Sequence, residues 1–291
     1  MMVQSQYSQL LSLWFISFIF LINNPIVYIG KNIFINMKQE SEWLDKNSRI
    51  VLVGDLHIGT KGFREDIFND ILEDISKPNT LWVGLGDYVE GREPSHKFYD
   101  FEESTLAVGE QYDYFFKKIE PYVDRCLGMV HGNHEVSLIN KTTLNPLQNF
   151  CFGANVNYFG DTGYLTLMCS DESYVDTKMR MVITHGAGGG ATVGASLNKI
   201  NNFAKNFIGD VVCVGHYHKL CSNIEVQPKV INGVHTWKPK LIVMNGSCLE
   251  GYREDGLGSY VEKKMLPPQA LGYAVIEFDN MFKPSAKLIP Y

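Results

Sequence analysis

The sequence predicts an α/β protein, and three observations support this fold class. Short apolar runs typical of buried strands alternate along the chain with amphipathic, helix-like runs. Five of the apolar runs end in a polar group rich in Asp, His or Asn. The composition, 45% hydrophobic and 20% charged over 291 residues, is that of a globular chain with a sizeable core.

The first half of the predicted domain contains three strands and two helices. A helix over Asp66–Ile75 is predicted because its apolar residues recur at helical spacing. A second helix is expected over Gln111–Ile119, immediately before Pro121. The predicted strands, each followed closely by Gly-Asp or Gly-Asn, are Ile50–Val53, Leu81–Gly84 and Leu127–Val130.

The second half is predicted to be richer in strands. The expected strands are Tyr164–Met168, Met181–Thr184, Val211–Val214, Leu241–Met244 and Tyr273–Phe278. Between the second and third of these, GAGGGATVGASLNKINNFAKNF predicts a glycine-rich loop followed by a helix. No linker-like stretch separates Arg49 from Tyr291, so we expect one domain over residues 37–291, preceded by an apolar extension over residues 1–36.

Polar groups follow five of the predicted strands, where ligands bind in open α/β sheets. These groups are Asp55-Leu56-His57, Gly86-Asp87, Gly132-Asn133-His134-Glu135, Thr184-His185-Gly186 and Gly215-His216-Tyr217-His218. Carboxylates and imidazoles together suit Mn, Fe, Zn or Ni. Because no cysteine lies in the groups, a structural zinc-thiolate site is not expected. The sequence therefore predicts a metal site at the strand ends.

Two histidines of the last group, His216 and His218, are one residue apart. In an extended strand, residues i and i+2 point to the same side. Both imidazoles are therefore expected to face the metal site, with Tyr217 pointing away between them.

Taken in order, the five groups resemble the pattern D-x-H, G-D, G-N-H-[ED], H and G-H-x-H of the calcineurin-like metallophosphoesterase superfamily. The resemblance covers Arg49 to Phe278. It implies a two-sheet α/β/β/α sandwich with mixed sheets and a dinuclear metal site at the C-terminal ends of the strands. It also implies a phosphoester hydrolase in which a metal-bound hydroxide attacks phosphorus in line.

The resemblance assigns roles residue by residue. The expected ligands are Asp55, His57 and His218 for one metal ion, Asn133, His185 and His216 for the second, and Asp87 as a bridge between them. His134 would not bind metal but would protonate the leaving oxygen or stabilise phosphoryl charge. Mn is the expected ion, with Fe, Zn or Ni as alternatives.

The stretch GDYVEGRE indicates which branch of the superfamily the chain resembles. In related phosphatases and nucleases, an Asp three residues after the bridging Asp orients the acid histidine. Glu90 occupies that position here and is a candidate partner for His134, with a solvated surface Glu as the alternative. Gly91 stands where serine/threonine phosphatases have a phosphate-binding Arg, and Arg92 comes one residue later. We therefore expect a phosphodiesterase or nuclease, with a protein phosphatase or a non-catalytic metal-binding scaffold as alternatives.

Basic and aromatic residues are candidates for substrate contacts. Arg64 and Arg92 are candidates to bind a phosphate. A later set would stack on bases and contact phosphates, or form a solvated loop with packing tyrosines: Tyr252, Arg253, Tyr260, Lys263 and Lys264. DNA or a nucleotide is thus a candidate substrate, although the net charge of −6 excludes a large basic surface.

The N-terminal sequence allows three interpretations. Residues 10–22, LLSLWFISFIFLI, are apolar but shorter than the ~20 residues of a membrane-spanning helix. The true start is Met37, or the segment is a membrane anchor, or it is a signal peptide. We expect a cytoplasmic protein, with membrane anchoring as the alternative. An anchored enzyme would have lipid-linked or nucleotide diphosphates as candidate substrates.

The six cysteines form no C-x-x-C pair. Cys126 and Cys213 lie in apolar, strand-like runs. Buried, reduced thiols in a reducing compartment are therefore expected. The oligomeric state is not predicted by any of these features.

Overall fold

The computed structural model describes residues 39–44, 47–97, 99–171, 174–254 and 259–291, all within one compact unit. The apolar segment over residues 10–22 and the candidate start at Met37 lie outside these ranges. Within the described ranges, no helix combines the length and the apolar character needed to cross a membrane.

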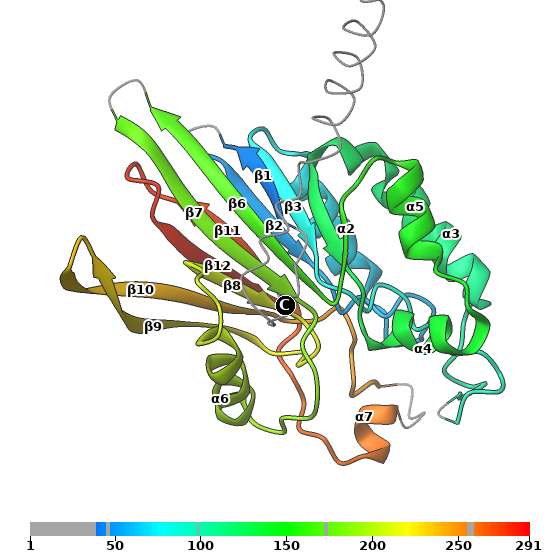
Figure 1. Cartoon of the computed structure of the whole chain (residues 1–291). Helices are drawn as coiled ribbons and strands as arrows, with labels where there is room; N and C mark the ends of the chain where they lie inside the picture. The colour runs from blue at the N-terminus through cyan, green and yellow to red at the C-terminus, as the bar shows by residue number, and fades with distance from the viewer. Residues whose placement is uncertain (1–38, 45–46, 98, 172–173, 255–258) are drawn as a thin grey trace, which may run out of the picture. The chain divides into compact units, whose positions relative to one another are not determined.

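Two six-stranded sheets form the centre of the unit (Figure 1). In spatial order, the first sheet contains β1 (Gln39–Trp43), β6 (Thr162–Asp171), β7 (Tyr174–Thr184), β8 (Val211–Val214), β10 (Val234–Asn245) and β9 (Leu220–Ile231). The second contains β12 (Pro284–Pro290), β11 (Gly272–Phe278), β2 (Arg49–Val53), β3 (Thr80–Gly84), β4 (Cys126–Val130) and β5 (Tyr158–Gly160). Parallel and antiparallel pairs occur in both sheets, which confirms the prediction of mixed sheets.

Helices cover the outer face of each sheet. The helices of the described residues are α2 (Glu65–Ser76), α3 (Val108–Ile119), α4 (Asn133–Thr142), α5 (Pro146–Gly153), α6 (Val193–Ala204) and α7 (Tyr260–Lys263), with a 3₁₀ helix over Glu120–Arg125; α7 lies apart from the sheets. Leu52 and Ile183 belong to the apolar cluster between the sheets. Phe68 of α2 packs in the cluster on the second sheet, and Ile200 of α6 in the cluster on the first. This arrangement confirms the α/β/β/α sandwich.

The central strands are continuously apolar because both of their faces are covered. In β2, Ile50 and Leu52 face the other sheet, whereas Val51 and Val53 face the helices. The same burial on both faces explains why the sequences of β3, β4, β7 and β8 contain continuous apolar runs that predict strands. All eight predicted strands and all three predicted helices fall within or overlap observed elements.

Several observed elements lack this signal and are not predicted. The helix α4 begins inside the polar motif at Asn133, which reads as a loop. In the β9–β10 hairpin, only the buried end, Leu241–Met244, has the expected apolar run. The outer part of the hairpin is exposed, with Val226 and Trp237 56% and 72% accessible, so no burial pattern marks it.

The five cysteines whose side chains are described form no disulfide with one another. Cys151, Cys213 and Cys248 are buried, while Cys126 and Cys221 are half-buried. Burial is thus as expected for three of these five residues, and their reduced state stays a prediction.

Candidate metal centre

The polar groups predicted at five strand ends come together at neighbouring edges of the two sheets. Asp55 and His57 follow β2 of the second sheet, and His216 and His218 follow β8 of the first. The backbone N–H of His216 donates to both carboxylate oxygens of Asp55, at 3.0 and 2.8 Å. Residues that are about 160 positions apart in the sequence thus share one site.

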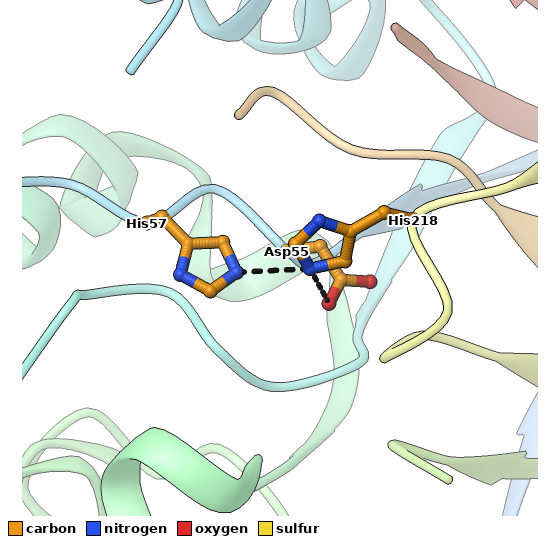
Figure 2. Close-up of side chains that lie close together, drawn as sticks. All are labelled: Asp55, His57 and His218. Carbon is orange, nitrogen blue, oxygen red and sulfur yellow. Dashed lines mark hydrogen bonds and ion pairs between the residues drawn. The ribbon is translucent and has the colours of Figure 1, made fainter. Parts of the chain in front are cut away.

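The first ligand group consists of Asp55, His57 and His218, which form one set of clustered donor atoms. Nε2 of His57 lies 3.1 Å from Nε2 of His218, which lies 3.4 Å from Oδ1 of Asp55 (Figure 2). A cation with ligands at about 2.1 Å would place neighbouring donor atoms about 3.0 Å apart in an octahedral site and about 3.4 Å apart in a tetrahedral one. The spacing of the first ligand group therefore fits a divalent metal ion.

The second ligand group consists of Asp87, Asn133, His185 and His216, and it centres on Nε2 of His185. This nitrogen lies 3.1 Å from Oδ2 of Asp87 and 3.1 Å from Oδ1 of Asn133. It also lies 3.2 Å from Nδ1 of His216. Carboxylate, amide and imidazole donors thus converge at a spacing that again fits a divalent ion.

The other ring nitrogen of three of these histidines is held by an acceptor. Nδ1 of His57 lies 3.0 Å from Oε2 of Glu90. Nδ1 of His185 lies 2.7 Å, and Nε2 of His216 3.0 Å, from backbone carbonyl oxygens. Such contacts fix the tautomer and the ring orientation of metal-binding histidines. When the imidazole is neutral, the nitrogen that faces the site can then offer its lone pair to a metal ion.

The expectation that His216 and His218 sit on an extended strand is wrong. β8 ends at Val214, and both histidines have left-handed backbones, with φ of 67° and 50°. The turn sends His216 to the second ligand group and His218 to the first. Tyr217 packs in the apolar cluster beneath α6 and donates its hydroxyl to the carbonyl of Ala187 at 2.9 Å.

Five of the seven candidate ligands have a left-handed backbone. The residues concerned are Asp55 (φ 51°), His57 (56°), Asp87 (50°), His216 (67°) and His218 (50°). For non-glycine residues this conformation costs about 1–2 kcal/mol each. Such strain concentrates at functional sites, where the surrounding structure maintains it.

Two glycines allow the strand ends to approach this closely. A Cβ at Gly132 would lie 2.1 Å from Oδ1 of Asp87, and one at Gly215 would lie 2.9 Å from Oδ2 of Asp55. Any side chain at either position would therefore collide with a candidate metal ligand.

The two ligand groups differ in their electrostatics. Burial alone would raise the pKa of Asp87 and lower that of His185, but their mutual attraction dominates. The pKa of Asp87 is held well below its usual range, and the pKa of His185 rises to about 10. In the first ligand group, burial lowers the pKa of His57 more than its hydrogen bond to Glu90 raises it, and the nearby His134 and His218 lower it further.

His134 lies beside both ligand groups. Its ring centroid is 4.7 Å from that of His57, and its Nε2 is 3.9 Å from Oδ2 of Asp87. Its Nδ1 donates to the backbone carbonyl of Glu90 at 2.5 Å, which directs Nε2 toward the site. Burial alone would lower the pKa of His134, but Asp87 and Glu90 raise it above its usual value.

Glu90 contacts two histidines in different ways. Its main chain holds His134, whereas its carboxylate forms the hydrogen bond to His57 and stays 3.7 Å from Nδ1 of His134. Arg92 pairs with the other carboxylate oxygen at 2.8 Å. Although burial opposes ionisation, His134 and His57 lower the pKa of Glu90 to about 2. The closest contact between Glu90 and the predicted acid is therefore a backbone hydrogen bond.

Glu135 is a supporting residue to which sequence analysis assigns no role. It is 1% exposed, and its carboxylate accepts N–H groups from Asp87 (2.8 Å), Tyr88 (3.0 Å) and Gly132 (2.7 Å). It thus ties the loop after β3 to the loop after β4. The only sequence signal is its place in the G-N-H-E motif, which does not indicate these partners.

A cleft of about 1150 Å³ borders the centre. Its lining includes His57, Asn133, His134, Arg92, Arg253 and Lys264. Two basic side chains of the lining have acidic partners. Arg253 forms two contacts of 2.6 Å with Glu103, and Lys263 pairs with Asp100 at 2.5 Å.

The remaining predicted substrate contacts are placed as follows. Arg64 pairs with Asp66 at 2.6 Å and lies 3.7 Å from Glu250, and it is not among the described residues that line the cleft. The hydroxyl of Tyr252 donates to a backbone carbonyl at 2.6 Å. The side chain of Tyr260 lies outside the described part of the structure.

A family model for calcineurin-like phosphoesterases matches residues 48–220, more than half of the chain. The chain belongs to the calcineurin-like phosphoesterase family. The matched span includes both ligand groups and His134. No curated protein matches the sequence of this chain.

Solved structures of several proteins resemble this chain distantly. A metallophosphoesterase from Sphaerobacter thermophilus is 12% identical, with 84% of this chain and 89% of that chain covered and a TM-score of 0.38. Vps29 from Entamoeba histolytica complexed with Zn²⁺ is 12% identical, with 84% and 98% covered and a TM-score of 0.37. GAP50 of Plasmodium is 11% identical, with 84% of both chains covered and a TM-score of 0.43.

Proposed function

We propose that this protein is a metal-dependent phosphodiesterase or nuclease that uses two divalent ions. The observation that carries the proposal is the pair of ligand groups beside one cleft, with His134 in contact with a member of each. Family membership supports phosphoester hydrolysis as the class of reaction.

The donor atoms of each ligand group fit one ion. Asp55, His57 and His218 would hold the first ion, and Asn133, His185 and His216 the second, with Asp87 shared between them. Bound divalent ions neutralise phosphoryl charge and lower the pKa of water toward neutrality. Mn is the proposed ion, with Fe, Zn or Ni as alternatives that the same donor atoms also suit.

His134 would act as the proton donor. The backbone carbonyl of Glu90 holds its Nδ1–H, so that Nε2 faces the site where a leaving oxygen would lie. A positioned acid of this kind contributes typically about 10²–10⁴-fold to a rate. His134 would thereby have a role distinct from that of the candidate metal ligands, whose site-facing ring nitrogens lie close to one another.

The size of the cleft supports a diester. Its volume of about 1150 Å³ exceeds the range of about 300–1,000 Å³ typical of small-ligand pockets. A nucleotide or a DNA strand would occupy such a space, and Arg92 and Lys264 on its lining would face the phosphates.

Hydrolysis of bis-p-nitrophenyl phosphate by the full chain with Mn²⁺ tests the proposal. Asp87→Ala should abolish turnover, and His134→Ala should lower kcat by about 10²-fold or more while Mn²⁺ remains bound. His235→Ala, which removes an exposed histidine of β10, is the matched control and should change nothing. Mn²⁺ binding without turnover of any mono- or diester, nucleotide or DNA would instead favour a non-catalytic metal-binding scaffold.

A further inference from the structure

A second cavity, of about 460 Å³, also borders the second ligand group, and we name it the side pocket. Asn133 and Tyr217 line both the side pocket and the large cleft, and His185 lines the side pocket. The candidate metal centre therefore lies where two cavities meet. No residue of the side pocket other than the ligands has a role in the proposed hydrolysis.

The interior of the side pocket is apolar. Ile200 and Phe203 of α6, Val214 of β8 and Val136 of α4 form its walls. Ile200 and Val214 are only 3% and 1% exposed, so these walls are fixed by the core packing beneath α6. Such walls suit a flat, apolar group that enters from the side of the metal centre.

The lining of the side pocket also carries two groups of opposite charge. The Asp161 side chain is 92% exposed and lies 2.9 Å from Nε2 of His131 through Oδ1. Lys199 donates one N–H to the carbonyl of Gly189. Both side chains retain further hydrogen-bonding capacity, as acceptor and donor respectively. His131 itself is fully engaged, because its Nδ1 contacts the Tyr158 hydroxyl at 2.6 Å.

These features distinguish between possible occupants. A second phosphate would meet the carboxylate of Asp161 and apolar walls that cannot hydrogen-bond to it. A nucleobase has apolar ring faces for the walls and both a donor and an acceptor on its edge, for Asp161 and Lys199. The volume of about 460 Å³ lies within the range of small-ligand sites.

We infer that the side pocket binds one arm of the phosphodiester through a nucleobase-sized aromatic group, while the large cleft binds the other arm. The inference rests on the proposed function, because it places the phosphorus at the metal centre between the two cavities. A diester has an organic group on each side of phosphorus, whereas a monoester has one. The two-cavity arrangement therefore selects diesters.

Filling the side pocket tests this inference. Ala187 is exposed and lines the side pocket but not the cleft, so Ala187→Trp should fill the pocket without disturbing the core. Val136→Trp fills it from α4 as a second variant. Asn202→Trp, at an exposed position of α6 that borders neither cavity, is the matched control.

With Mn²⁺-loaded full chain, both pocket variants should lower kcat/KM for bis-p-nitrophenyl phosphate by about tenfold or more. For p-nitrophenyl phosphate, kcat/KM should stay within about twofold, because a monoester can place its single arm in the large cleft. Equal losses on both substrates, or no loss on the diester, would overturn the inference.

Adenosine, which has no phosphate, probes the side pocket independently of hydrolysis. Ligand-observed NMR should show binding to the wild type and to Asn202→Trp, and binding about tenfold weaker or more to Ala187→Trp. If the wild type hydrolyses no phosphoester but adenosine behaves in this way, the proposed function fails and the nucleobase site stands. If turnover occurs but adenosine binds equally to all three proteins, the nucleobase assignment is wrong.

Discussion

The two ligand groups contain similar side chains, but the pKa of a histidine is shifted in opposite directions in the two groups. In the second group, the buried pair of Asp87 and His185 lies 3.1 Å apart, and Asp87 raises the pKa of His185 to about 10. In the first group, burial lowers the pKa of His57, and its neighbouring histidines add to this effect. Without metal at neutral pH, His185 therefore carries a proton that His57 does not.

This difference shows how each group is held together before metal binds. In the second group, Asp87 and His185 form an ion pair, and the proton on Nε2 of His185 competes with a metal ion for that nitrogen. In the first group, Nε2 of His218 lies 3.1 Å from Nε2 of His57 and 3.4 Å from Oδ1 of Asp55, and the pKa of His57 is lowered rather than raised, so a cation meets less competition from a proton there. Metal binding at the second group should consequently depend more strongly on pH.

The largest expected effect is on this pH dependence. Because a metal ion must displace the proton of His185, Mn²⁺ affinity at the second group should rise about tenfold per pH unit below pH 10. Calorimetry in two buffers of different ionisation enthalpy should show about one proton released at that group near pH 7.5. In Asp87→Asn the pKa of His185 falls, so that proton release should disappear. Equal proton release at both groups would contradict the comparison.

A smaller effect is expected from the carboxylate that supports the second group. In Glu135→Gln, the amide cannot accept all three N–H groups that the carboxylate accepts. A buried donor without a partner costs about 1–3 kcal/mol. Urea unfolding of the metal-free protein should show a loss of that size, and an unchanged free energy of unfolding would refute this role for Glu135.

The smallest effect is expected from the carboxylate that supports the first group. Glu90→Gln retains a contact to Nδ1 of His57 but loses the negative charge, and the side chain of Glu90 is 13% exposed to solvent. Outer partners of metal-binding histidines typically contribute about 10–100-fold to metal affinity. Titration with Mn²⁺ should show about tenfold weaker binding at the first group alone. Weaker binding at the second group would mean that Glu90 does not act through His57.

The sequence predicts the positions of the candidate ligands better than their geometry. Asp55, Asp87 and His185 are predictable because each follows a strand buried on both faces, which gives a strong apolar signal. The left-handed turn that separates His216 from His218 has no such signal, since an alternating H-x-H reads as extended. Local periodicity therefore locates the site but not the directions of its side chains.

Supporting contacts are less predictable because they depend on partners distant in the sequence. Glu135 accepts N–H groups from residues 47 and 48 positions earlier, and the carboxylate of Glu90 hydrogen-bonds to His57 more closely than to His134. Which residues meet is decided by the packing of strand ends from two sheets. The side pocket is likewise formed by α4, α6 and β8 together, so no single motif predicts it.

The number of Mn²⁺ ions bound by the wild type and by the variants His216→Ala and His218→Ala tests the central claim most directly. Equilibrium dialysis with elemental analysis should give two ions per wild-type chain and one per variant chain. Proton release should accompany the ion that remains in His218→Ala, at the second group, and not the one that remains in His216→Ala. Two ions retained in either variant, or a single ion in the wild type, would contradict the assignment of these histidines to two different metal ions.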